Sequence, residues 1–164
     1  SKAVSPPPQT QVAAGWSPAV GLAARLVVAA VFIFSALHKL SAPPQEFAAV
    51  IDAYLILSPR NTLPLATVLP WAELGIGLCL AGGYWTRACA PAAGGMLGVF
   101  ILALGSTIAR GITLEHCGCF GPGIHLPPLQ AIGLDATLAA LAALAYRSGG
   151  RLFALDNWVA QGLD

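Results

Sequence analysis

Long apolar stretches separated by short polar segments are the dominant pattern along the chain. Four of these stretches reach the roughly 20 residues that a helix needs to cross a bilayer. They are residues 18–40, 63–85, 88–109 and 126–145. The pattern predicts an all-α integral membrane protein, a four-helix bundle whose transmembrane domain covers residues 18–146.

A shorter helical pattern follows the first long stretch. Apolar residues recur at Phe47, Val50, Ile51, Tyr54 and Leu55, and the polar residues between them lie off this stripe. We expect a short amphipathic interfacial helix that lies on the membrane surface or caps the bundle. At the chain ends, the sequence predicts a disordered, proline-rich tail over residues 1–17 and an interfacial tail over residues 147–164.

Composition supports a membrane protein. Hydrophobic residues make up 57% of the 164 residues and charged residues only 9%, against roughly 25% charged in soluble domains. The net charge of +1 gives no basic footprint, so we expect no nucleic-acid partner.

The lysines and arginines predict the orientation in the membrane. Four spans put both termini and the second turn on one side, which carries five basic residues against three on the other. We therefore expect cytoplasmic termini and an extracytoplasmic loop between the third and fourth spans. Arg25, near the cytoplasmic end of the first span, is expected to be a snorkelling anchor. The two groups are Lys2, Arg25, Arg87, Arg147 and Arg151, and Lys39, Arg60 and Arg110.

The loop before the fourth span carries two thiols one residue apart, in the stretch EHCGCFGPG at residues 115–123. Cys117 and Cys119 can close only a very small ring, for which Gly118 supplies backbone freedom. Strained or exposed disulfides tend to be oxidising and are often catalytic. His116 and Arg110 favour the reactive thiolate. The motif predicts a redox-active pair, with His116 as the residue that tunes it.

Two alternatives for this loop stay open. In the first, the thiols have no redox role and are bystanders or form a static disulfide. In the second, they bind a soft metal ion such as Cu(I), Zn or Hg together with His116 and His125. The other two cysteines, Cys79 and Cys89, flank the second turn. They are candidates for a second thiol pair that passes electrons across the membrane, or simply small apolar core residues.

Two acidic residues lie inside predicted spans, Glu73 and Asp135. Both are expected about 12 Å from the extracytoplasmic end, where an isolated charge costs at least about 2.5–3.5 kcal/mol. His38 and Lys39 are the candidate partners, and Ser35 could donate a hydrogen bond to either acid. The group is interpreted equally as a proton relay or as a polar clamp between helices.

Two further features concern packing and cofactors. Trp71, close to Glu73, is a candidate contact for a flat quinone ring, although an aromatic residue in a span more often serves packing. Gly94, Gly95 and Gly98 permit a close approach of the third span to a neighbouring helix.

The chain resembles a known family. The first span and its loop, with Arg25, Phe34, Lys39, Pro43 and Pro59, are similar to those of DoxX-like four-helix membrane proteins. The segment LPWAELGIGLCLAGG is similar to their second span. The CGCFG motif at residues 117–121 resembles the loop of the MauE branch, the methylamine-utilisation membrane proteins. The likeness covers about residues 20–146.

This resemblance implies a redox-associated protein of the bacterial inner membrane with a thioredoxin-like extracytoplasmic partner. The catalytic pair of the family would fall on Cys117 and Cys119. The architecture is also similar to the quinone-linked thiol oxidases of the DsbB and VKOR type, an analogy of fold alone, which makes a quinone a candidate cofactor.

We therefore predict a membrane thiol–disulfide oxidoreductase, with electrons passing in either direction. The alternatives are a membrane protein that binds or transports a soft metal, and a non-catalytic scaffold for a membrane redox complex.

Overall fold

A computed structural model of the protein describes residues 18–112 and 126–147, and this part of the chain is helical with no strand. The predicted tails lie outside these residues, apart from Arg147, which is the last residue of a helix. Four of the helices are long and apolar enough to cross a membrane, so the protein is an all-α, multi-pass membrane protein. The helices are α1 (Pro18–Leu40), α2 (Pro44–Ala53), α3 (Pro59–Gly82), α4 (Thr86–Ala109) and α5 (Pro128–Arg147).

Proline and glycine set several helix boundaries. Helices α2, α3 and α5 begin with a proline, whose fixed φ suits the first helical position, where no N–H bond is needed. Because Pro59 starts α3, this helix begins before the predicted apolar run at Leu63. It ends at Gly82, since Gly83 adopts the left-handed conformation with φ 66°. Trp85 is also left-handed, with φ 48°, and the turn leads directly into α4.

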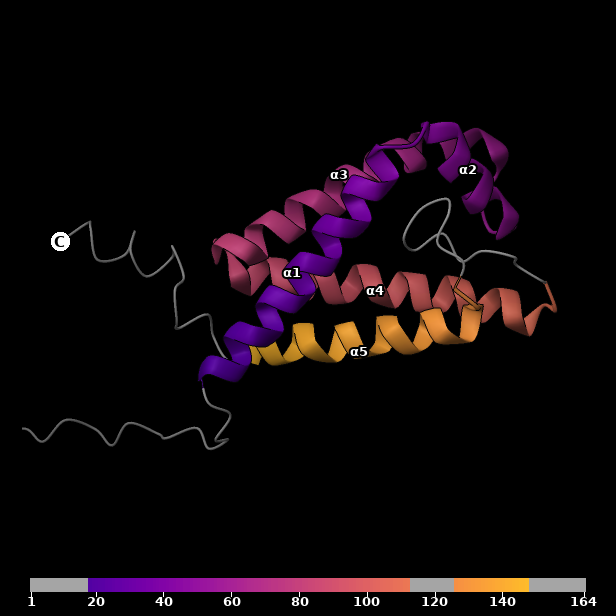
Figure 1. The fold of residues 1–164 in the computed structure, drawn as a ribbon. Coiled ribbons are helices and arrows are strands. Elements are labelled where there is room, and N and C mark those ends of the chain that lie inside the picture. The colour runs from indigo at the N-terminus through magenta and orange to yellow at the C-terminus, as the bar shows by residue number, and fades with distance from the viewer. Residues whose placement is uncertain (1–17, 113–125, 148–164) are drawn as a thin grey trace, which may run out of the picture.

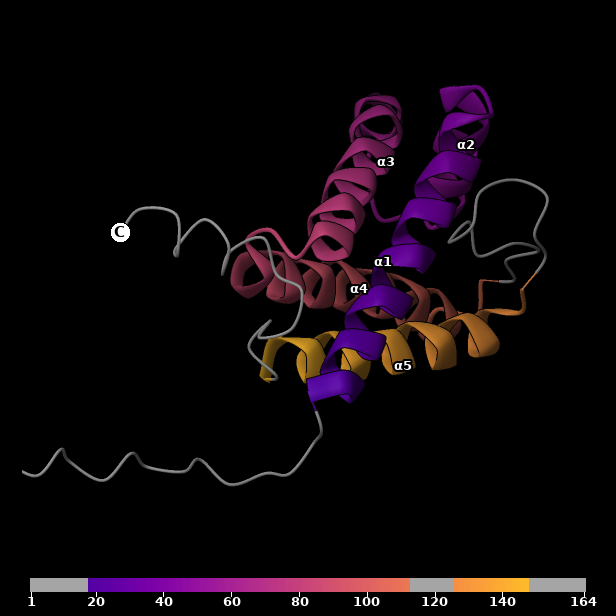
Figure 2. The same cartoon turned by 60° about the vertical axis from the view of Figure 1, so that its left-hand side comes forward.

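The four long helices are arranged as a bundle that opens toward one end. Helices α4 and α5 run side by side along their length, and α1 packs against α3 and α5. Helices α3 and α4 meet at the Gly83–Trp85 turn and diverge away from it, as Figures 1 and 2 show. We call the end with this turn the hairpin end and the opposite end, where α2 lies, the α2 end.

The amphipathic stripe predicted in the first loop is helix α2, and its apolar face packs against α3. Phe47 and Ala48 are buried in a cluster with Ala66 of α3. Val50 and Ile51 pack against the same cluster. Helix α2 therefore covers part of the bundle, which fits the second of the two arrangements expected for it.

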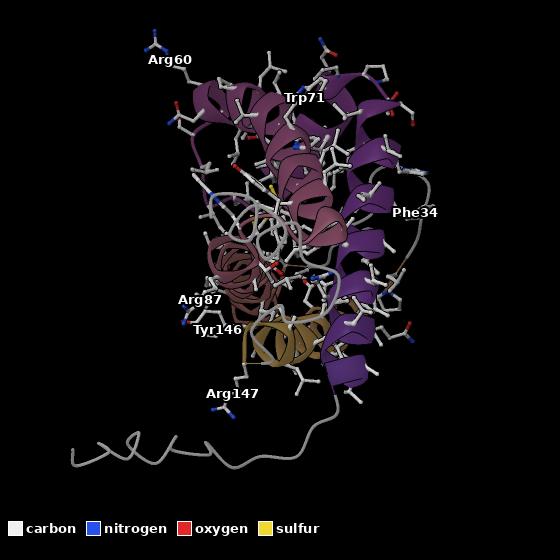
Figure 3. All side chains as sticks on the ribbon, turned by 90° about the vertical axis from the view of Figure 1, so that its left-hand side faces the viewer. Phe34, Arg60, Trp71, Arg87, Tyr146 and Arg147 are labelled. Atoms are coloured by element: carbon white, nitrogen blue, oxygen red, sulfur yellow. The ribbon has the colours of Figure 1, made fainter. Side chains whose placement is uncertain are left out.

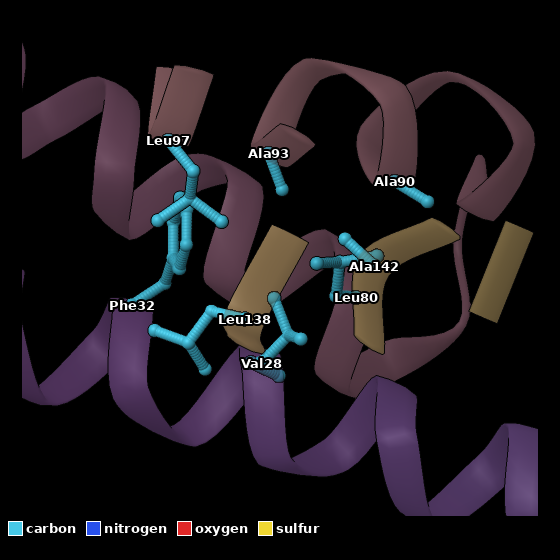
Figure 4. Packing of buried hydrophobic residues seen from close by; sticks show 9 residues of the cluster. Val28, Phe32, Leu80, Ala90, Ala93, Leu97, Leu138 and Ala142 are labelled. Carbon is cyan, nitrogen blue, oxygen red and sulfur yellow. The ribbon is translucent and has the colours of Figure 1, made fainter. Parts of the chain in front are cut away.

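The main apolar core lies where all four long helices meet, and Figure 4 shows its side chains. Close packing of α1 against α3 depends on Gly77, because a Cβ added there would lie 2.8 Å from Ile33 Cγ1 and 3.1 Å from the Ile33 backbone nitrogen. Within residues 18–112 and 126–147, no helix makes the close approach that Gly94, Gly95 and Gly98 permit, since an added Cβ would meet no atom of this part of the chain within 4 Å. The core comprises Val28, Ala29, Phe32, Leu80, Ala90, Ala93, Leu97, Leu138 and Ala142.

The first span carries a buried arginine. Arg25 is only 3% exposed, because it lies on the face of α1 that also buries Ala24, Val28 and Ala29. The expectation that Arg25 is a snorkelling anchor on the surface is therefore wrong. Its guanidinium is part of the bundle interior near the hairpin end.

Candidate functional site

A buried ion pair joins the end of α1 to the middle of α3. Lys39 Nζ lies 2.6 Å from Glu73 Oε1 and 2.9 Å from Oε2, and the two side chains are 1% and 3% exposed. Ser35 donates a further hydrogen bond of 3.2 Å to Glu73 Oε2. Ser35 and Lys39 are four residues apart, so they project from the same face of α1. The sequence-predicted partners Lys39, Ser35 and Glu73 are thus in direct contact.

Two aromatic rings complete the surroundings of the Lys39 ammonium. Nζ lies 5.0 Å from the ring centroid of Phe47 in α2 and 5.5 Å from that of Phe100 in α4. At these distances the ring faces attract a cation. The sequence analysis missed both roles, although Phe100 lies on the buried stripe that includes Leu97 and Leu104. Through these contacts Lys39 connects α1 with α2, α3 and α4.

A small cavity lies beside the ion pair and contains a second carboxyl group. Its volume is about 20 Å³, enough for one water molecule. Asp135 of α5 is 4% exposed and lines this cavity together with Ser35 and Glu73. The remaining walls are apolar and come from Val31, Phe32, Leu97, Phe100 and Leu138.

His38 takes no part in this cavity. The His38 side chain is half-buried, and its ring centroid lies 6.2 Å from that of Phe34, which is 53% exposed. Its Nδ1 atom is buried and has no hydrogen-bond partner within residues 18–112 and 126–147. Of the four predicted relay or clamp residues, Glu73 and Asp135 line the cavity, Lys39 is bonded to Glu73, and His38 does neither.

Trp71 lies on the outer surface of α3. Its side chain is 61% exposed, whereas Glu73, two residues later, is 2% exposed. Figure 3 labels Trp71 and Phe34 among the outward-facing side chains of the bundle. The cavity at Glu73 is far smaller than a quinone ring, so we place no quinone there. The quinone prediction is left with Trp71 as its single candidate contact.

Cys79 and Cys89 are not joined to each other by a disulfide in the structure. Cys79 belongs to α3 and Cys89 to α4, near the hairpin end, and both are half-buried. Cys89 packs against the main apolar core, as expected of a cysteine that acts as a small hydrophobe. A redox role for this second pair stays a prediction.

Arg110 ties the end of α4 to the end of α2. Its Nη2 donates to the carbonyl oxygen of Tyr54 at 2.6 Å, and its Nη1 donates to that of Leu55 at 3.1 Å. Its Nε donates to the Ser106 carbonyl at 3.1 Å, which holds the side chain against α4. Leu55 has a left-handed backbone with φ 52°. Arg110 therefore fixes the chain at the point from which the loop to α5 departs.

The predicted redox residues Cys117, Cys119 and His116 lie outside the described residues, as does His125 of the metal alternative. By chain order this loop joins the ends of α4 and α5 at the α2 end. Within residues 18–112 and 126–147, no group of three or more histidine, cysteine or acidic side chains could hold a metal ion. Both interpretations of the loop stay predictions.

Comparisons with known proteins identify the relatives of this chain. The family described as methylamine utilisation protein MauE matches residues 17–148. The chain is 32% identical to the methylamine utilization protein MauE of Paracoccus denitrificans over 80% of its own length and 70% of that protein. It is 32% identical to that of Methylophilus methylotrophus (76% and 64%) and 36% identical to that of Paracoccus versutus (76% and 67%). No solved structure shows significant similarity to the chain. A wider grouping with DoxX-like proteins stays a prediction.

Proposed function

Since the chain belongs to the MauE family, we propose that it serves methylamine utilisation as a membrane thiol–disulfide oxidoreductase. In this proposal Cys117 and Cys119 exchange a disulfide with an extracytoplasmic, thioredoxin-like partner, and His116 favours the thiolate. The observation that carries the proposal is the placement of the C-x-C motif, seven residues after Arg110. Arg110 donates hydrogen bonds to the carbonyl oxygens of Tyr54 and Leu55, directly after α2, so the motif follows a fixed point of the bundle.

The exchange needs no further oxidant, because the partner supplies it. A thiolate of the loop attacks one sulfur of the partner disulfide, which gives a mixed disulfide and one partner thiolate. The second loop thiol then attacks the mixed disulfide from within the loop. The loop disulfide forms, the partner leaves as a dithiol, and two electrons and two protons have passed to the partner. The reverse sequence oxidises a partner dithiol at the expense of the loop disulfide.

Burial of two basic residues strengthens the proposed orientation. Arg25 and Lys39 lie inside the bundle, so neither acts as a loop charge in the positive-inside rule. By chain order, four basic residues then flank the hairpin end: Lys2, Arg87, Arg147 and Arg151. Two flank the α2 end: Arg60 and Arg110. We therefore place the hairpin end in the cytoplasm and the loop with Cys117 and Cys119 outside the bacterial inner membrane.

Trapping of the mixed disulfide tests this function. In a background with Cys79→Ala and Cys89→Ala, a Cys119→Ser protein keeps Cys117 as its single thiol. Expressed in cells, it should capture a soluble thiol protein through a bond that a reductant releases. Cys117→Ser is the counterpart, and the variant with both serines should capture nothing. Stoichiometric soft metal in the purified reduced protein, lost with either loop cysteine, and no captured partner would instead support the metal-binding alternative.

A further inference from the structure

Two exposed arginines lie on adjacent helices at the hairpin end. Helix α4 begins at this end and α5 ends there, and the two helices run side by side. Arg87 is the second residue of α4 and Arg147 is the last residue of α5, and both are exposed. Figure 3, which looks at this end, shows Arg87, Tyr146 and Arg147 on the same side of the molecule. The outer surface of the hairpin end therefore presents two guanidinium groups.

Three aromatic side chains with a polar group lie at the same end. The rings of Tyr84 and Trp85 are stacked, with their centroids 5.6 Å apart and an angle of 7° between their planes. Both rings are exposed, and so is that of Tyr146. Tyrosine and tryptophan are enriched at the depth of the lipid headgroups, where the ring contacts lipid and the polar group contacts water. The aromatic side chains therefore place Arg87 and Arg147 at headgroup depth.

No acidic side chain within residues 18–112 and 126–147 lies at the hairpin end. The acids of these residues belong to α2, to the middle of α3 and to the first half of α5, and they are Glu46, Asp52, Glu73 and Asp135. Arg25, the third arginine near this end, is buried inside the bundle. The charge that the described residues expose there is therefore positive, which is complementary to an anion.

The membrane-facing surface next to the arginines consists of small side chains. Between Arg87 and Val99, the exposed residues of α4 are alanine, proline and glycine, and the exposed residues of α5 over 133–143 are glycine, alanine and threonine. From Arg87 to Val99 this surface is about 18 Å long, close to the roughly 15 Å of hydrocarbon in one leaflet. A lipid chain can therefore follow both helices from the headgroups to the bilayer centre without meeting a large exposed side chain. We call this the small-residue surface, and it comprises Ala88, Pro91, Ala92, Gly95, Gly133, Ala136, Thr137, Ala140 and Ala143.

We propose that the hairpin end of α4 and α5 binds an anionic phospholipid, whose phosphate group lies between Arg87 and Arg147 and whose acyl chains lie along the small-residue surface. Guanidinium groups hold phosphate oxygens through charge-assisted hydrogen bonds, and basic clusters beside membrane helices recognise anionic headgroups in this way. A lipid suits the surface better than an acidic protein does. The connection between α3 and α4 is a turn of three residues, Gly83–Trp85, and the small-residue surface faces hydrocarbon. The inference goes beyond the proposed function and holds whichever chemistry the cysteine loop performs.

Native mass spectrometry of the full chain in detergent tests the site without any substitution. The protein is titrated with phosphatidylglycerol and, separately, with phosphatidylcholine that has the same acyl chains. We expect one phosphatidylglycerol molecule per chain to bind about tenfold more tightly than phosphatidylcholine, because the two arginines repel the positive charge of choline.

Substitutions locate the headgroup and the acyl chains. Arg87→Gln and Arg147→Gln should each weaken the binding of phosphatidylglycerol about tenfold. Arg60→Gln is the matched control, because it removes an exposed arginine at the α2 end with the same change of net charge, and it should bind as the wild type does. Ala140→Leu places a bulky side chain on the small-residue surface and should also weaken binding, whereas Val99→Leu, beyond that surface, should not.

Three results would overturn the proposal. In the first, the wild-type protein binds the two lipids equally. In the second, Arg60→Gln weakens binding as much as Arg87→Gln and Arg147→Gln do, which would reduce the effect to net charge. In the third, inorganic phosphate or polyglutamate at physiological ionic strength displaces phosphatidylglycerol from the wild-type protein, which would assign the arginines to a soluble anion or to an acidic protein. The first and third results are measured on the unchanged chain, so they decide the question even if a variant does not fold.

Discussion

The Arg110 guanidinium at the end of α4 donates a 2.6 Å hydrogen bond to the carbonyl oxygen of Tyr54, 56 residues earlier in the chain. Tyr54 also packs with Leu104 of α4 and Ala131 of α5. The end of α2 is therefore joined by a hydrogen bond and by apolar contacts to the two helices that carry the cysteine loop. This contact holds the chain seven residues before Cys117, the first cysteine of the proposed redox pair.

Replacement of Arg110 by alanine should lower the local stability at the end of α2. The variant loses the hydrogen bonds to Tyr54 and Leu55. We therefore expect the end of α2 to lose about 1 kcal/mol of local stability, so that its amide protons exchange faster with solvent. Hydrogen–deuterium exchange read by mass spectrometry measures this change. Arg60→Ala removes an exposed arginine at the same end as a control and should leave α2 unchanged. Equal exchange in both variants would contradict the anchoring role.

The Lys39–Glu73 pair should be strongly coupled in its effect on stability. Lys39→Met alone leaves the Glu73 carboxylate without its ammonium, and Glu73→Leu alone leaves the ammonium without its carboxylate. Loss of one partner of a buried pair costs about 3–5 kcal/mol, whereas an apolar replacement of both costs much less. We therefore expect the double variant to be more stable than the sum of the two single changes predicts. Thermal unfolding in detergent measures the stability changes of the two single variants and the double variant. If the change in the double variant equals the sum of the two single changes, the pair does not act as a unit.

Gly77→Ala should destabilise the bundle by about 1–3 kcal/mol, the usual effect of overpacking a core. The new methyl group would lie 3.1 Å from the Ile33 nitrogen and 3.2 Å from the Ala29 carbonyl oxygen, and these backbone atoms cannot rotate away. Gly95→Ala is a matched control in α4, because its methyl group would point into open space. Thermal unfolding of both variants compares them, and a melting temperature for Gly77→Ala that equals that of Gly95→Ala would refute the close contact of α1 and α3.

The Cys79→Ala, Cys89→Ala protein should exchange disulfides with its partner at the wild-type rate. Cys89 packs against the apolar core, as a small hydrophobe would. Alanine removes the sulfur with little change in packing, so the fold should survive. The rate of partner reduction or oxidation in reconstituted membranes is the relevant measurement. A large loss of exchange with an unchanged melting temperature would instead support electron transfer through this second pair.

The sequence predicted the spans well, because four apolar runs of membrane length leave little choice of element. It also named Lys39, together with His38, as a candidate partner of the two acids inside the spans, and the structure pairs Lys39 with Glu73. The sequence did not predict which face of each helix packs against a neighbouring helix. Arg25 and Gly94 are examples, because only the rotation of each helix about its axis decides which side faces a neighbour. Phe47 and Phe100 were likewise missed, since they reach Lys39 from two different helices.

The oxidation state of Cys117 and Cys119 during turnover tests the central claim most directly. Membranes that contain the Cys79→Ala, Cys89→Ala protein are treated with a maleimide of known mass before and after incubation with an oxidised thioredoxin-like protein. We predict that both loop thiols are labelled before the incubation, that both are protected after it, and that a reductant restores both. Thiols that label equally before and after, with every thioredoxin-like oxidant and reductant tried, would contradict the account.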